Sequence, residues 1–374
     1  MAAPRRPPPL RPALHALVFS ALGPLLASTS HARSTNAVDR FDEAIARELP
    51  QTIVLSDGKG GGALVIESLL DVELHFPDVS GDVPGAMYRV TWQGEQAMLT
   101  RSGGHLDISV PRSGDMEVTT FDRDAEGSHQ GRPDAPRGND ESAAHRASRQ
   151  RRAVPRDARN GTTAASRPRA ASSPVLVFWL FLHDDTLDMT REHIHAKYVA
   201  WWIADMKRIL PTRRLWAIYS QQVDGLTDIA YGQASSLKDW TTAVDSYARR
   251  ERLPHVRGEF EYKFMLLTGN QVAPGVSGLA WLGGDHAMAS LKGRYTIVAH
   301  EYGHTLTASH EDAEVRWSSG WPCETNLKST TSLLRANCYR YSAANERRMR
   351  SYMANEWTVP VRPDPPDTPH YMVE

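Results

Sequence analysis

The segment from His300 to His310 constrains the fold most, because it places three imidazoles and a carboxylate at fixed spacings. His300 and His304 are four residues apart, so on a helix they share one face and can reach the same metal ion. Glu301 projects beside that ion. His310 follows six residues after His304, far enough for the chain to end the helix, turn back and supply a third nitrogen. Three nitrogens and one open position form the ligand set of a catalytic zinc ion.

This spacing resembles the metzincin signature, His-Glu-x-x-His-x-x-Gly-x-x-His. The residues His300, Glu301, His304 and His310 match four of its five fixed positions, and Thr307 stands where the family has glycine. That glycine lets the backbone turn sharply after the second ligand, in a conformation that a β-branched residue disfavours. The replacement of glycine by Thr307 therefore affects the turn that must bring His310 to the metal.

The resemblance, in particular to the reprolysin-like arm of the family, implies a zinc endopeptidase that acts on protein or peptide substrates. One Zn²⁺ per chain would activate a water molecule, with Glu301 as the general base. Family members also pair the substrate with an edge strand just before the zinc helix. The residues in the matching position are Gly278, Leu279, Ala280 and Trp281.

A methionine in a tight turn beneath the zinc is a further property of the family. Met353 is the direct candidate, but residues 341–353 are predicted to form a helix, which favours Leu333 or Leu334 in that place. Two other interpretations stay open. One is a gluzincin-type peptidase, whose third ligand would be Glu324 or Glu346. The other is a non-catalytic, zinc-stabilised binding or adhesion module, although such a module has no use for Glu301.

The first 32 residues are typical of a signal peptide. Arg5 and Arg6 precede an apolar stretch from Ala13 to Ala27, and small residues follow up to Ala32. The stretch is too short to span a bilayer easily, and no later segment is apolar enough. We therefore expect a secreted or periplasmic protein with no integral membrane segment after signal removal. The formal net charge of −1 argues against nucleic acid as the main partner.

Cys323 and Cys338 are the only two cysteines. In an oxidising compartment they are expected to form one disulfide bond. Its loop of roughly fifteen residues corresponds to about 3 kcal/mol in the chain-entropy description. We discount zinc ligation by cysteine, because three histidines already supply a complete set of ligands.

The remaining chain divides into four regions. Residues 33–121 alternate apolar and polar side chains between Gly and Pro clusters, which predicts a small β-rich domain that could serve as a pro-domain of a zymogen. Residues 122–173 are predicted to be a disordered Arg/Ala/Ser/Pro linker, because they lack the apolar side chains to fold, and Arg149 to Arg152 would suit a processing protease. Residues 174–357 are predicted to be the catalytic domain, and residues 358–374 a Pro-rich tail.

Strands and helices alternate in the catalytic region. The continuous apolar run from Val175 to Leu182 predicts a buried strand, and residues 215–219, 262–267 and 286–290 predict further strands. Helices are expected from Thr190 to Leu210 and from Ser236 to Arg250. The predicted fold class is α/β (α+β): a metzincin-like catalytic domain with a mixed sheet and an active-site helix, preceded by the small β-rich domain.

Overall fold

The apolar run from Val175 to Leu182 forms the strand β8, and all eight of its residues are buried. Its side chains alternate between the two faces of a sheet, as the period of a strand requires. Leu176 and Phe178 belong to a core shared with the helices α3 (Ala200–Ile209) and α5 (Ile297–Thr305). Val177 and Trp179 belong to a second core beneath the helix α4 (Ser236–Glu251). Helices therefore cover this part of the sheet on both faces.

The computed structural model describes residues 36–56, 61–78, 81–112, 114–123, 175–254, 260–318, 320–328, 334–354 and 370–373. All of them lie in one compact unit, Asn36–Glu374. The predicted signal peptide, nearly all of the predicted linker and most of the Pro-rich tail lie outside the described residues. No helix in the described ranges combines the length and apolar character that a membrane crossing requires.

The first elements along the chain are one helix and seven strands: α1 (Ala37–Ile45), β1 (Gln51–Ser56), β2 (Gly61–Leu69), β3 (Val72–Asp78), β4 (Gly81–Trp92), β5 (Glu95–Ser102), β6 (His105–Pro111) and β7 (Met116–Asp122). The region 33–121 is thus mostly strands, whereas its being a domain of its own stays a prediction. Helix α1 begins after Asn36, whose side chain accepts a hydrogen bond from the Asp39 amide. Its Phe41 is fully buried against the strands.

After β8 the order is η3 (Asp184–Thr186), α2 (Arg191–Ile194), the π-helical turn η4 (His195–Val199), α3 (Ala200–Ile209), β9 (Arg214–Gln221), α4 (Ser236–Glu251), β10 (Phe260–Thr268), β11 (Val276–Ala280), β12 (His286–Ser290) and α5 (Ile297–Thr305). The chain continues with β13 (Val315–Ser318), β14 (Trp321–Glu324), β15 (Ala336–Asn337), α6 (Ala343–Met353) and β16 (His370–Val373). The single helix predicted from Thr190 to Leu210 is thus interrupted by a π-helical turn.

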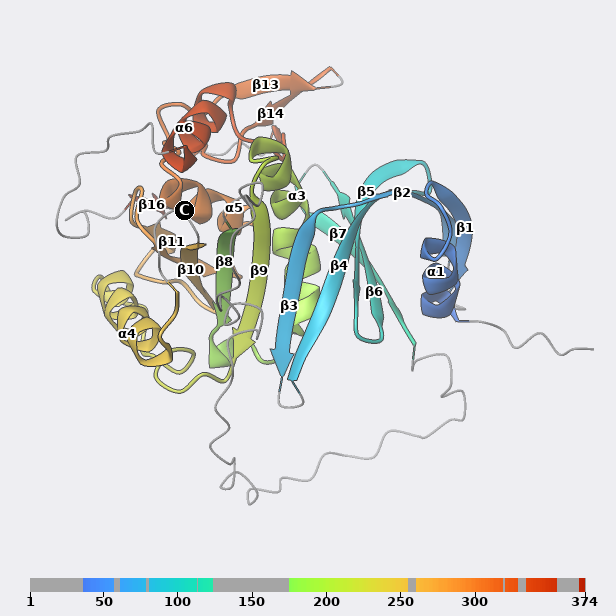
Figure 1. Ribbon diagram of the computed structural model, residues 1–374. Coiled ribbons are helices and arrows are strands. Elements are labelled where there is room, and N and C mark those ends of the chain that lie inside the picture. Colours follow the sequence, from blue (N-terminus) through green and yellow to red (C-terminus); the bar gives the residue numbers. More distant parts are fainter. Residues whose placement is uncertain are drawn as a thin grey trace, which may run out of the picture. The chain divides into compact units, whose positions relative to one another are not determined.

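Thirteen strands share one mixed sheet, whose main path runs β16-β11-β12-β10-β8-β9-β3-β4-β5-β6-β7 (Figure 1). Strands β12, β10, β8, β9 and β3 are parallel, and β11 is antiparallel to β12. The sequence predicts a mixed sheet, and the structure has one. A separate three-stranded sheet, β13-β14-β15, follows the helix α5.

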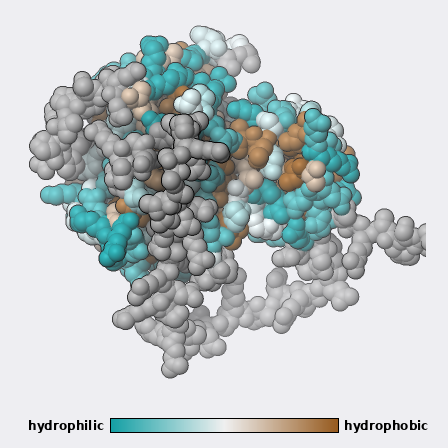
Figure 2. Space-filling view, viewed as in Figure 1, coloured by the Kyte–Doolittle hydropathy of each residue, from teal (hydrophilic) through white to brown (hydrophobic). Residues whose placement is uncertain are grey.

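The N-terminal strands are continuous with this sheet, because β3 pairs in parallel with β9. The β6–β7 region also contacts the helical side: Ser109 donates a hydrogen bond to the carbonyl of Ala196 over 2.7 Å. Figure 2 shows hydrophobic residues gathered over these N-terminal strands. Val54 on β1 and Leu69 on β2 are 60% and 58% exposed. Whether residues 33–121 act as a pro-domain stays a prediction.

Candidate metal centre

Helix α5 carries the first three residues of the motif and is buried along its whole length. His300, Glu301 and His304 are at most 1% exposed. Gly303 is the point of closest packing: a Cβ added there would lie 2.9 Å from the ring of Tyr341 and 3.0 Å from Leu327. Glycine at this position lets the helix lie deep in the core and fixes the direction of its histidine face.

The three histidines converge. The Nε2 atom of His310 lies 2.8 Å from that of His300 and 3.1 Å from that of His304. The opposite ring nitrogens are held by backbone carbonyls: Nδ1 of His300 donates to Asn326 over 2.9 Å, and Nδ1 of His304 donates to Ala308 over 2.9 Å. These carbonyl acceptors assign the tautomer in which each Nε2 presents a lone pair.

Such a cluster fits a divalent metal ion. Nitrogen ligands about 2.0–2.1 Å from a tetrahedral zinc ion lie roughly 3.3 Å from one another, close to the observed separations. The lone pairs of His300 and His304 both face His310, whose Nε2 can donate a proton to only one of them. A cation satisfies all three nitrogens together. In the described part of the chain these three residues are the only His, Cys, Asp or Glu group close enough to hold a metal ion.

The turn before His310 has, at Thr307, the backbone conformation that glycine usually adopts. Thr307 has a φ of 70°, in the left-handed region. Its amide donates to the carbonyl of His304, and the amide of Ala308 donates to Gly303, each over 2.9 Å. This pair of hydrogen bonds is the Schellman motif, whose left-handed position is usually glycine. The threonine thus follows the same backbone route at the cost of local strain.

Helix α6 holds the segment that contains His310, a role that the sequence analysis missed. Asn345 accepts a hydrogen bond from the Ser309 amide over 2.8 Å and donates to the Ser309 carbonyl over 3.0 Å. Arg348 donates to the Thr307 carbonyl over 2.9 Å. These side chains lie on a polar helix more than thirty residues away in the sequence, and no local pattern marks them.

Glu301 has an unusual environment for a buried carboxyl group. It is 0% exposed, and neither of its oxygens has a hydrogen-bond partner among the described residues. Burial raises the pKa of this group. Its carboxyl group lies against the backbone of Gly278 on β11, where an added Cβ would lie 2.2 Å from Oε1. The side chain of Glu301 therefore lies between helix α5, which carries it, and strand β11.

Strand β11 contains three of the four residues predicted to pair with a substrate, Gly278, Leu279 and Ala280. Trp281 follows the strand, and its side chain is buried: it is 7% exposed, belongs to the core beneath α4 and donates to Thr241 over 2.9 Å. Whether these four residues contact a substrate stays a prediction. The outer edge of β11 pairs with β16.

Two of the three positions predicted for the family's methionine, Met353 and Leu334, lie in the described part of the chain. Met353 is 3% exposed and ends the helix α6, within the core that also contains α5. Leu334 is 75% exposed, which excludes it as a buried platform, and Leu333 lies outside the described residues. The helix predicted for residues 341–353 is confirmed as α6.

The two glutamates of the gluzincin alternative have other partners. Glu324 pairs with Arg335 over 3.2 Å, and Glu346 pairs with Arg350 over 2.8 Å and with Arg208. Neither belongs to the histidine cluster, whereas His310 does. The described geometry therefore favours His310 as the third ligand.

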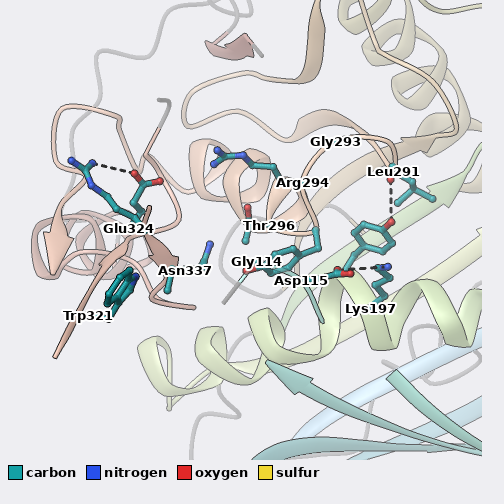
Figure 3. A pocket seen from close by; sticks show the side chains of 14 residues that line it. Gly114, Asp115, Lys197, Leu291, Gly293, Arg294, Thr296, Trp321, Glu324 and Asn337 are labelled. Carbon is teal, nitrogen blue, oxygen red and sulfur yellow. Dashed lines mark hydrogen bonds and ion pairs between the residues drawn. The ribbon is translucent and has the colours of Figure 1, made fainter. Parts of the chain in front are cut away.

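The predicted disulfide bond between Cys323 and Cys338 is present. It ties β14 to the segment after β15, close in sequence to the Asn326 carbonyl that orients His300. A cavity of about 860 Å³ lies beside this region, at the start of α5 (Figure 3). It is lined by Thr296, Glu324 with Arg335, and Lys197 with Asp115; of the described residues around it, none is a motif histidine.

The sequence matches no protein-family model, and no curated protein matches it. Among solved structures, metalloproteinase-II from Bacteroides fragilis is similar with a TM-score of 0.48 and 13% sequence identity, over 86% of this chain and 96% of that chain. A likeness of this extent establishes neither the fold nor the activity of the chain. The three-histidine cluster is the observation on which a function can be argued.

Proposed function

We propose that the chain is a zinc-dependent endopeptidase of metzincin type, with His300, His304 and His310 as the metal ligands and Glu301 as the general base. The observation that carries this proposal is the convergence of three Nε2 atoms, together with a buried carboxyl group on the same helix that has no hydrogen-bond partner among the described residues. A purely structural metal site would not require that carboxyl group.

Each residue has a distinct part in the proposed reaction. When bound, the zinc ion supplies a Lewis acid that lowers the pKa of a water molecule and polarises a substrate carbonyl. Glu301 accepts the proton of the attacking water and returns it to the leaving amine. Its carboxyl group lies against Gly278 of β11, the strand along which we propose that an extended peptide substrate binds.

The backbone carbonyls of Asn326 and Ala308 hold His300 and His304 in orientation, which is the usual role of groups around metal-binding imidazoles. Asn345 and Arg348 do the same for the segment of His310. Because these contacts all come from the folded chain, the metal site is largely preorganised.

Export is a further part of the proposal. The disulfide bond favours an oxidising compartment, in agreement with the predicted signal peptide. We infer a secreted or periplasmic enzyme made as a precursor, with protein or peptide substrates.

The proposal is tested with Glu301→Gln, which retains the shape of the side chain but cannot accept the proton. Hydrolysis of an unstructured protein substrate should fall by about 10²–10⁴-fold while zinc binding is retained. A chelator should abolish the activity of the parent, and added zinc should restore it. Glu43→Gln, on the exposed face of α1, is the matched control and should retain full activity. Equal rates for parent and Glu301→Gln would refute the mechanism.

A further inference from the structure

Strand β16 occupies the outer edge of β11. It runs antiparallel to β11, with Ala280 opposite His370, Leu279 opposite Tyr371 and Gly278 opposite Met372. On its other side β11 pairs with β12. Figure 1 shows β16 as the last strand on this side of the sheet, next to β11. The chain thus adds one of its own segments to the strand that precedes the metal-binding helix.

The pairing register connects β16 to Glu301. Gly278 is the residue of β11 that lies against the Glu301 carboxyl group, and it is also the residue opposite Met372. The backbone of β16 therefore runs past the part of β11 that adjoins the proposed general base. An external peptide that added to this edge would use the same backbone groups of β11, so it could not bind while β16 is in place.

The geometry points to autoinhibition: the segment 370–373 of the same chain occupies the outer edge of β11, at which an extended peptide substrate would otherwise bind. This inference rests on the proposed function, because the competing ligand is an extended peptide substrate. Main-chain hydrogen bonds provide the affinity of such strand addition. A segment tethered to the same molecule competes at an effective concentration in the millimolar range.

The occupant is short, which makes its displacement feasible. Four residues form β16, so only a few ladder hydrogen bonds hold it. Alternate residues of an antiparallel strand direct both backbone groups to the neighbour. Of any two consecutive residues, one must therefore donate its amide to β11, and a proline in that place removes the donor.

The test compares two full-length double variants in the inactive, zinc-supplied Glu301→Gln protein. Tyr371→Pro with Met372→Pro removes a ladder amide, whereas Tyr371→Ala with Met372→Ala retains both amides. The probe is a fluorescently labelled synthetic peptide of residues 368–374, and its affinity is measured by anisotropy. We expect the proline pair to bind the peptide at least tenfold more tightly than the alanine pair or the Glu301→Gln parent. Equal affinities in the three proteins, or no binding to the proline pair, would overturn the inference.

A kinetic assay separates this inference from the proposed function. With Glu301 restored, the proline pair should show a several-fold lower KM for a peptide substrate than the alanine pair, with kcat unchanged. If the proline pair binds the labelled peptide as expected but no variant hydrolyses any substrate, the occupancy of β11 by residues 370–373 is supported and the enzymatic proposal fails.

Discussion

Lys263 and Glu301 are both ionisable and both 0% exposed, yet their surroundings differ completely. The Lys263 ammonium donates to Asp285 over 2.8 Å, to the hydroxyl of Tyr352 over 2.9 Å and to the Gly284 carbonyl over 3.1 Å. Burial lowers its pKa, but the charges of Asp285 and its other neighbours raise it above the ordinary value. Glu301 has no hydrogen-bond partner among the described residues.

The difference indicates two roles. Lys263 uses all three of its donors within the chain, and in doing so it joins β10 to the turn after β11 and to helix α6. Such a group is part of the architecture. A buried carboxyl group without partners costs free energy unless something outside the protein interacts with it. This environment is what the proposed function requires of Glu301, whose carboxyl group would interact with a ligand rather than with the fold.

The largest effect on stability is expected from Lys263→Met. The variant keeps most of the side-chain volume but leaves Asp285 and its neighbours without their cation. Removal of one partner from a buried ion pair is strongly destabilising, and we expect a loss of about 3 kcal/mol in the free energy of unfolding. Denaturant unfolding of the full chain measures it. Lys292→Met, at an exposed lysine, is the control and should change stability by less than about 0.5 kcal/mol.

A smaller effect of opposite sign is expected from Thr307→Gly. Glycine adopts the left-handed conformation of residue 307 without strain, and the change also removes a buried hydroxyl that lacks a partner in the described structure. We expect a gain of about 1 kcal/mol, with zinc affinity unchanged. Thr307→Ala retains the strain and should give no such gain. A loss of stability in Thr307→Gly would show that packing of the threonine methyl group against Gly283 outweighs the strain.

The smallest effect on stability is expected from Glu301→Gln in the metal-free protein. Because Glu301 contributes no hydrogen bond to the fold, its replacement by an amide of the same shape should alter the free energy of unfolding by less than about 1 kcal/mol. Thermal unfolding in the presence of a chelator measures the change. A loss of stability as large as that of Lys263→Met would mean that Glu301 is a structural residue. The contrast drawn between Lys263 and Glu301 would then be wrong.

Much of the fold could be predicted where the signal is local. The unbroken apolar run of β8 and the alternation in β4 and β6 indicate strands from the sequence alone, and α6 appears where the pattern predicts it. The sequence marks two strands of the N-terminal region, β1 and β5, only weakly, because polar residues flank or interrupt their short apolar runs. The parallel pairing of β3 with β9 joins segments more than a hundred residues apart, and no local pattern encodes it.

In the candidate site, too, the local features could be predicted from the sequence and the tertiary contacts could not. The spacing of His300, His304 and His310 is local, and the structure brings the three residues together. The supports of the site come from distant segments: Asn326, Asn345 and the packing of Gly278 against Glu301 depend on tertiary contacts. The family resemblance implied that β11 is an edge strand, but the structure pairs it with β12 on one side and β16 on the other. The pairing with β16 is non-local, so no local pattern could indicate it.

The most direct test of the central claim is the zinc content of the purified protein, measured by elemental analysis after dialysis against a trace of zinc. The parent and Glu301→Gln should each hold one zinc ion per chain. His300→Ala and His304→Ala should lose it, because two remaining ligands hold the ion poorly. His310→Ala should lower the affinity strongly, whereas Glu324→Ala and Glu346→Ala should not. Full zinc occupancy in both His300→Ala and His304→Ala would contradict the assignment of the metal centre.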